Sequence, residues 1–139
     1  MKEDFVTYEI AKKLKEQGFN VECHAYYEPL KHCLNLSRVL QTNSLAGNYN
    51  CIAAPTISQV LKWLRDKKKI FVAINIGYCY ESYEIPFPTN PKMEPILKGY
   101  YYGIWELDNL NDKNARSEYF EAPEFAILAG IEYVLNNLI

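Results

Sequence analysis

Cysteine and histidine side chains gather in the first third of the chain. Cys23 is followed directly by His24, His32 by Cys33, and Cys51 comes later. Thiolates and imidazoles bind structural zinc, which needs four ligands in a tetrahedron. Adjacent residues of an extended strand point to opposite faces, which separates Cys23 from His24 and, if their segment is extended, His32 from Cys33. We therefore interpret these residues as core thiols and surface histidines, and predict no metal site.

The same side chains are also the candidates for nucleophilic catalysis. A cysteine nucleophile needs a histidine within hydrogen-bond distance and a third group to orient that histidine. No catalytic family signature surrounds any cysteine, and the chain has no GxSxG turn, GxGxxG turn, P-loop or calcium-loop pattern. The sequence predicts a protein that is not an enzyme and that carries no cofactor.

Tyrosine is the unusually frequent residue type, with twelve in the chain. Three are consecutive, and since neighbours on a strand alternate between faces, at least one of them must point away from the core. Exposed tyrosine supplies contact area with little loss of side-chain entropy. The alternative, that the rings simply cover the sheet, stays open. The candidate interaction surface comprises Tyr78, Tyr80, Tyr83, Tyr100, Tyr101 and Tyr102.

A basic cluster forms a second candidate surface. Part of it follows one face of an expected helix, where it could contact phosphates. Cations at the carboxyl end of a helix also complement the helix dipole without any partner, and we favour that interpretation. The cluster comprises Lys62, Arg65, Lys67, Lys68 and Lys69.

Apolar spacing and capping residues predict three helices, over residues 8–17, over residues 56–66, and from about residue 123 to the end of the chain. The second begins with a capping box, in which Thr56 is followed three residues later by Gln59. The third begins at a proline, a residue suited to the first helical turn.

Alternating apolar residues predict strands over residues 19–27, 70–80 and 98–107, of which the last two pair antiparallel. We expect residues 28–54 to form a long loop that hides a strand or a turn of helix, or else serves a function, and residues 108–117 to form a turn. Proline cannot donate to a ladder, so four prolines must occupy a connection or a sheet edge. They are Pro86, Pro88, Pro91 and Pro95.

These elements predict an α+β fold: a small antiparallel or mixed sheet packed by about three helices, in the order helix, strand, loop, helix, strand, strand, helix. A chain of 139 residues is the size of one domain, which we expect to span residues 1–139. The formal charge of −2 gives no field that would attract a polyanion, so we do not expect nucleic acid to be the main partner.

The expected location is the cytoplasm, without membrane association. No segment is long and apolar enough to span a membrane, and the amino terminus is polar and lacks a signal-peptide pattern. We read the four cysteines as reduced thiols, although four cysteines allow three complete disulfide pairings and their spacing does not choose among them. They are Cys23, Cys33, Cys51 and Cys79.

Three short motifs carry a resemblance. They are the opening segment 4–11 with Gly18 and Phe19, the Ala54-Pro55-Thr56 entry to a helix containing Trp63-Leu64-Arg65, and the Glu121-Ala122 entry to the last helix. In these motifs the chain resembles small uncharacterised proteins of gut-bacterial (Bacteroides-like) prophages and mobile elements. The resemblance covers most of the chain outside residues 30–50, implies a biological context and supplies no site residues.

Two functions remain. The first is a non-enzymatic protein-interaction domain, self-associating or binding another protein through the tyrosine-rich hairpin. The second is a single-stranded nucleic-acid-binding accessory protein that adds the basic cluster. Salt dependence separates the two, because phosphate contacts weaken steeply as salt rises.

Overall fold

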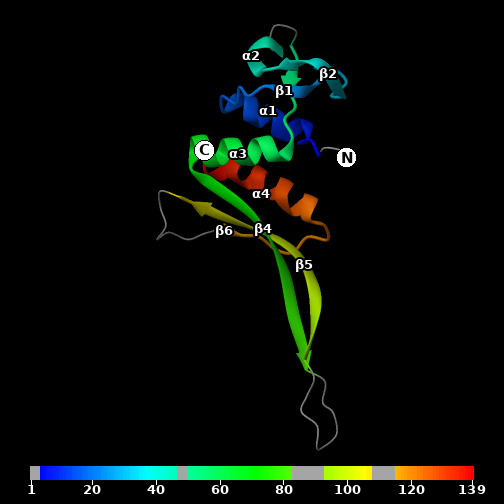
Figure 1. Ribbon diagram of the computed structural model, residues 1–139, viewed down its shortest axis with the longest axis vertical. Helices are drawn as coiled ribbons and strands as arrows, with labels where there is room; N and C mark the ends of the chain where they lie inside the picture. The colour runs from blue at the N-terminus through cyan, green and yellow to red at the C-terminus, as the bar shows by residue number, and fades with distance from the viewer. Residues whose placement is uncertain (1–3, 47–49, 83–92, 108–114) are drawn as a thin grey trace, which may run out of the picture.

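The computed structural model describes residues 4–46, 50–82, 93–107 and 115–139 of the chain. The described residues form two three-stranded antiparallel sheets, with helices between and beside them (Figure 1). The predicted α+β class is therefore confirmed. The strands form two small sheets rather than the one expected.

The first sheet has the order β2-β1-β3. It consists of β1 (Cys23–Tyr27), β2 (Leu34–Gln41) and β3 (Ile52–Ala53), and α1 (Tyr8–Glu16) and the short α2 (Asn43–Ala46) accompany it. The expected long loop over residues 28–54 thus holds two strands and a turn of helix. Polar residues interrupt this segment, so its runs of alternating apolar residues are too short to predict the strands.

Asn43 shows why such a polar residue belongs inside the fold. Its side chain is buried, donates to the carbonyl of Phe19 (2.6 Å) and accepts from the amide of Ala53 (3.0 Å). An asparagine that is typical of a loop therefore satisfies two buried backbone groups and joins distant segments.

The two longer helices are α3 (Ile57–Lys68) and α4 (Pro123–Asn137). The predicted capping box is confirmed, because the Thr56 hydroxyl accepts from the Gln59 amide while the Gln59 side chain accepts from the Thr56 amide. The helix runs to Lys68, beyond the predicted end at residue 66, and stops where the next residue turns left-handed.

The second sheet has the order β4-β5-β6 and consists of β4 (Ile70–Ser82), β5 (Met93–Glu106) and β6 (Ala115–Arg116). The predicted antiparallel hairpin is confirmed, and β5 begins earlier than expected. Pro95 lies inside β5, where β4 is its only described neighbouring strand and a missing amide on the outer edge is tolerated. Of the turn predicted over residues 108–117, residues 108–114 lie outside the described residues, and Ala115 and Arg116 form β6, which pairs with Gly103 and Ile104.

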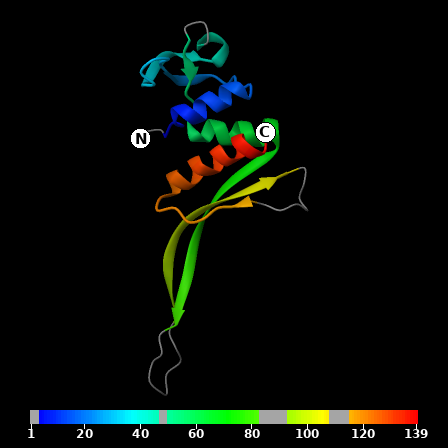
Figure 2. The same ribbon diagram turned by 180° about the vertical axis from the view of Figure 1, so that it is seen from behind.

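One buried cluster joins α1, the first sheet, α3, β4, β5 and α4. The helices α3 and α4 lie between the first sheet and the upper part of the hairpin (Figure 2). Gly130 allows α4 to approach the hairpin closely. A Cβ there would lie 2.9 Å from Val72 Cγ1 and 3.0 Å from Tyr102 Cγ.

Candidate functional site

The far half of the β4–β5 hairpin projects beyond the helices (Figure 1). The ladder runs from the pair Ile70↔Glu106 to the pair Ser82↔Met93. Along the outer edge of β5, the last pairing is the isolated bridge between Tyr100 and Phe120. Beyond that point β4 and β5 are, among the described residues, the only strands of the hairpin. We call this part, residues 76–82 and 93–99, the arm.

Two glycines at the base of the arm let the chain after β6 approach the hairpin. Gly77 and Gly99 face each other in the ladder, with a register shift immediately beyond them. Gly99 has a φ of 135°, and a Cβ there would lie 2.6 Å from the Phe120 carbonyl oxygen. The ring of Tyr119 occupies the space above Gly77. This close approach fixes where the covered part of the hairpin ends.

The arm exposes large apolar side chains. Ile76, Tyr78 and Leu97 are 50%, 53% and 51% exposed. Tyr78 and Leu97 are paired across the ladder. Of the predicted interaction residues, Tyr78 therefore lies on an accessible surface. Tyr80 lies in β4 but its side chain is not described, and Tyr83 lies outside the described residues.

Tyr100 and Tyr102 lie on the face of the hairpin that α4 covers. Tyr102 is half-buried, with its ring centroid 6.3 Å from that of Phe120 and 6.1 Å from that of Tyr133. Burial, and then the neighbouring Tyr133, raises the pKa of Tyr102 above its ordinary value. For this tyrosine, covering the sheet is therefore the role that its contacts support.

Tyr101 lies on the opposite, open face of the hairpin. Its ring makes an edge contact with Tyr119, at 5.9 Å between centroids, and the Arg116 guanidinium lies 4.2 Å from its centroid. The alternation predicted for the three consecutive tyrosines is thus present. Only the middle one faces away from α4.

The open face continues toward the body with aromatic residues that the sequence analysis did not select. Phe71 and Trp105 are paired across the ladder and are 44% and 46% exposed. Their alternation with buried Val72 and Ile104 was visible in the sequence. The sequence did not show which of the two faces α4 would cover.

The basic cluster lies at the other end of the hairpin. Lys62, Arg65, Lys67 and Lys69 are exposed, while Lys68 is half-buried with its Nζ 5.3 Å from the Trp63 ring centroid. Arg65 is paired with Asp66 at 3.2 Å. The cluster lies at the carboxyl end of α3, directly before β4 begins at Ile70. Tyr78 is eight residues further along β4, a distance of about 26 Å along a strand. The structure does not bring the lysines and the arm together.

Cys23, Cys33 and His32 lie in different surroundings. Cys23 is buried, and this burial raises the pKa of its thiol to about 11, which makes it a poor nucleophile. Cys33 is exposed, and His32 stacks on Tyr8 with 3.7 Å between ring centroids. Among the described residues, no three His, Cys, Asp or Glu side chains lie close enough together to hold a metal ion.

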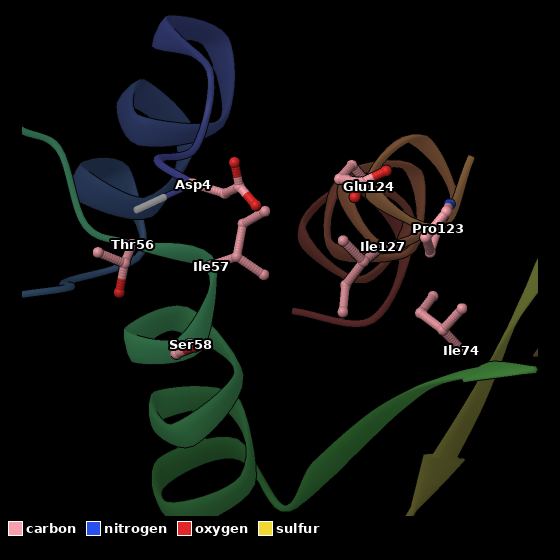
Figure 3. A pocket seen from close by; sticks show the side chains of 8 residues that line it. All are labelled: Asp4, Thr56, Ile57, Ser58, Ile74, Pro123, Glu124 and Ile127. Carbon is pink, nitrogen blue, oxygen red and sulfur yellow. The ribbon is translucent and has the colours of Figure 1, made fainter. Parts of the chain in front are cut away.

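A cleft of about 360 Å³ opens between the start of α3 and the start of α4 (Figure 3). Half-buried Ile57, Ile74 and Ile127 form its apolar part, and the carboxylates of Asp4 and Glu124 lie at its rim. Glu124 lies in the first turn of α4, where its negative charge complements the helix dipole. The backbone carbonyl of Asp4 accepts from the Ile57 amide and so holds the amino-terminal segment against the start of α3.

In the part of the chain that the structure describes, no helix has the length and apolar character needed to cross a membrane. No protein-family model, no curated protein and no solved structure matches this chain.

Proposed function

We propose that this chain is a non-enzymatic protein-interaction domain that binds a partner protein through the arm. The observation that carries the proposal is the half-exposed apolar set Ile76, Tyr78 and Leu97, on a ribbon that projects beyond the described helices (Figure 1). Tyrosine is enriched among the residues that dominate protein interfaces, and neighbouring aliphatic side chains help to exclude water around it.

The energetics of a two-stranded ribbon support the same proposal. An isolated hairpin is only marginally stable in water, because it has no third strand or helix to bury its apolar face. A partner that covers Ile76, Tyr78 and Leu97 would remove this apolar surface from water. Such burial contributes about 25 cal/mol of favourable binding free energy per Å² of apolar surface. Burial of this surface by a partner protein would therefore explain why the arm exposes apolar side chains.

Charge favours protein over nucleic acid as the partner. Between Ile70 and Glu106 the sequence contains four acidic residues and two basic ones, a net charge of −2. Nucleic-acid affinity comes largely from lysine and arginine contacts with phosphates. The basic cluster is suited to ending α3, whose dipole it complements.

The proposal includes no cofactor and no catalytic step, as expected from a sequence without a catalytic or cofactor-binding motif. We also propose a cytoplasmic location and, from the resemblance to prophage proteins, a partner in a gut-bacterial cell. The buried Cys23 thiol is consistent with a reducing compartment.

The test is site-specific photo-cross-linking in such a cell. A benzophenone amino acid replaces Tyr78 in one variant and Phe125 in a matched control, since Phe125 is an aromatic residue of α4 that is 60% exposed. We expect a defined protein adduct from position 78 that is absent from position 125. The identified partner, purified, should bind Tyr78→Ser at least roughly tenfold more weakly than wild type, with little dependence on salt.

Equal adducts at both positions, or no adduct at position 78, would contradict the proposal. A nucleic-acid adduct whose affinity falls steeply with salt and with Lys62→Glu would instead establish the single-stranded nucleic-acid function. An adduct with a second copy of the chain would support self-association through the arm.

A further inference from the structure

The outer edge of β2 presents backbone groups that are ready to pair. The Glu28 amide donates to the Cys33 carbonyl (3.1 Å), while the Glu28 carbonyl accepts from the His32 amide in the turn (3.1 Å), so the backbone groups of these two opposed residues face each other. In an antiparallel ladder such pairs alternate with non-bonded ones. The next pair, Tyr27↔Leu34, is therefore non-bonded, and the amide and carbonyl of Leu34 point away from β1.

The other side of β1 gives an independent check of this assignment. The Ala54 amide donates to the Ala25 carbonyl (2.9 Å), so the backbone of Ala25 faces β3. Leu36 lies opposite Ala25 across the β1–β2 ladder. Its amide and carbonyl therefore also point outward, and two alternate residues of β2 offer four backbone groups to a further strand.

The side chains at these two positions provide apolar contact. Leu34 and Leu36 are 41% and 74% exposed, although they share a face with Ala25 and Tyr27, which are buried. The buried cluster includes side chains of β1, whereas Leu34 and Leu36 of β2 lie outside it. Natural sheet edges are usually protected by charged side chains, prolines or bulges. The regular part of β2, from Leu34 to Leu36, has no charged residue and no proline. Beyond Leu36 the register with β1 shifts before Gln41 pairs with Cys23, and Arg38 lies in that irregular stretch, so only the first part of the edge is unprotected.

Charge identifies the kind of strand that fits. No aspartate or glutamate occurs between Glu28 and Asp66, whereas Lys31 precedes β2 and Arg38 lies within it. Lys31 is exposed. Two copies of β2 paired with each other would bring like charges together, which is unfavourable across strands. An extended segment with acidic residues would instead be attracted.

We propose that the outer edge of β2 binds an extended acidic segment of a partner protein, which adds a fourth strand to the first sheet. This is the β-augmentation mode, in which main-chain hydrogen bonds give affinity and alternate side chains give specificity. The site lies at the end of the molecule opposite the arm (Figure 1), so it does not depend on the function proposed for the arm.

The test selects a random peptide library on the purified full chain. We expect the selected peptides to alternate apolar and acidic residues. Leu36→Pro removes one outward amide and leaves the ladder with β1 intact, and it should weaken binding by up to about tenfold, the value of one lost hydrogen bond. Leu36→Val is the matched control that keeps this amide. Lys31→Glu should weaken binding about two- to fivefold.

A second measurement leaves the protein unchanged and so does not depend on whether Leu36→Pro folds. Methylation of alternate amides of a selected peptide should abolish binding when it falls on the edge facing β2.

The proposal is overturned if no peptide is selected, if the selected peptides are basic, or if they bind Leu36→Pro as tightly as Leu36→Val. A dimer of the chain alone, with the Leu34 and Leu36 amides protected from hydrogen exchange, would identify a second copy as the occupant and also overturn it. Cross-linking at Tyr78 is expected to be unaffected by these variants, so failure here is distinguishable from failure of the arm proposal.

Discussion

The β4–β5 hairpin has two halves that share one ladder and differ in what covers them. Near the body, Val72 and Ile104 are a cross-strand pair under α4, 6% and 2% exposed. In the arm, Tyr78 and Leu97 are also paired, and both are half-exposed. The residues of both halves are suited to a strand. The two halves therefore differ in whether α4 packs on them, and not in how well their residues suit a strand. The half under α4 is structural, and the half beyond it is available for binding.

The largest expected effect compares one residue type in the two halves. Ile104→Ala should lower the free energy of unfolding by about 2–5 kcal/mol, because it leaves a cavity beneath α4. Ile76→Ala, at a half-exposed position, should cost about 1 kcal/mol or less. Urea denaturation of the two variants measures the difference. Equal losses would show that the arm is as well packed as the body.

The junction between the halves should also be sensitive. Gly99→Ala places a Cβ against the Phe120 carbonyl at a positive φ, and should cost about 1–3 kcal/mol. Gly18→Ala is the matched control, since Gly18 also has a positive φ but has no atom near the added Cβ. It should cost about 1 kcal/mol. If thermal unfolding gives the same loss for both, the close approach at Phe120 does not contribute.

A smaller effect is expected from the ring that covers Gly77. Tyr119→Ala removes the edge contact with Tyr101 and should cost about 1 kcal/mol. Tyr78→Ala, on the arm, should change the free energy of unfolding by about 0.5 kcal/mol or less, because Tyr78 lies outside the helix cover. Chemical denaturation of both variants tests this ranking, and a reversed order would contradict the structural role of Tyr119.

The smallest effect is a dependence on alkaline pH. Burial, and then Tyr133, raises the pKa of Tyr102 in the folded chain, so the folded state retains the phenolic proton better than the unfolded state. Stability from this group is complete below the ordinary tyrosine pKa of about 10 and is lost as the pH rises through the folded value. Tyr102→Phe should therefore lose less stability above that pH than wild type does. Parallel melting-temperature profiles for the two proteins would be evidence against this coupling.

Local signals in the sequence were enough to predict the long helices and the hairpin. The capping box at Thr56 and the proline at position 123 act on neighbouring residues only, so their effect can be read without knowing the fold. Strand alternation likewise placed Tyr101 on the opposite face from Tyr100 and Tyr102. It also paired the two strands correctly.

The segment between residues 28 and 54 could not be read in this way. Its strands β2 and β3 are stabilised by pairing with β1, and Asn43 is buried because it bonds to Phe19 and Ala53 from distant parts of the chain. None of these partners is adjacent in sequence. Local polarity therefore predicted a loop where tertiary contacts build part of a sheet.

The sequence by itself determined the long helices and the strands of the hairpin, and which of their side chains share a face, because these properties depend on periods of a few residues. Only the tertiary structure decided which faces are buried. The position of α4, set by its close contact at Gly130, covers one half of the hairpin, and the edge position of β2 leaves Leu34 and Leu36 exposed. Exposure depends on how distant elements pack together, and an alternating pattern has the same form whether or not another element covers it.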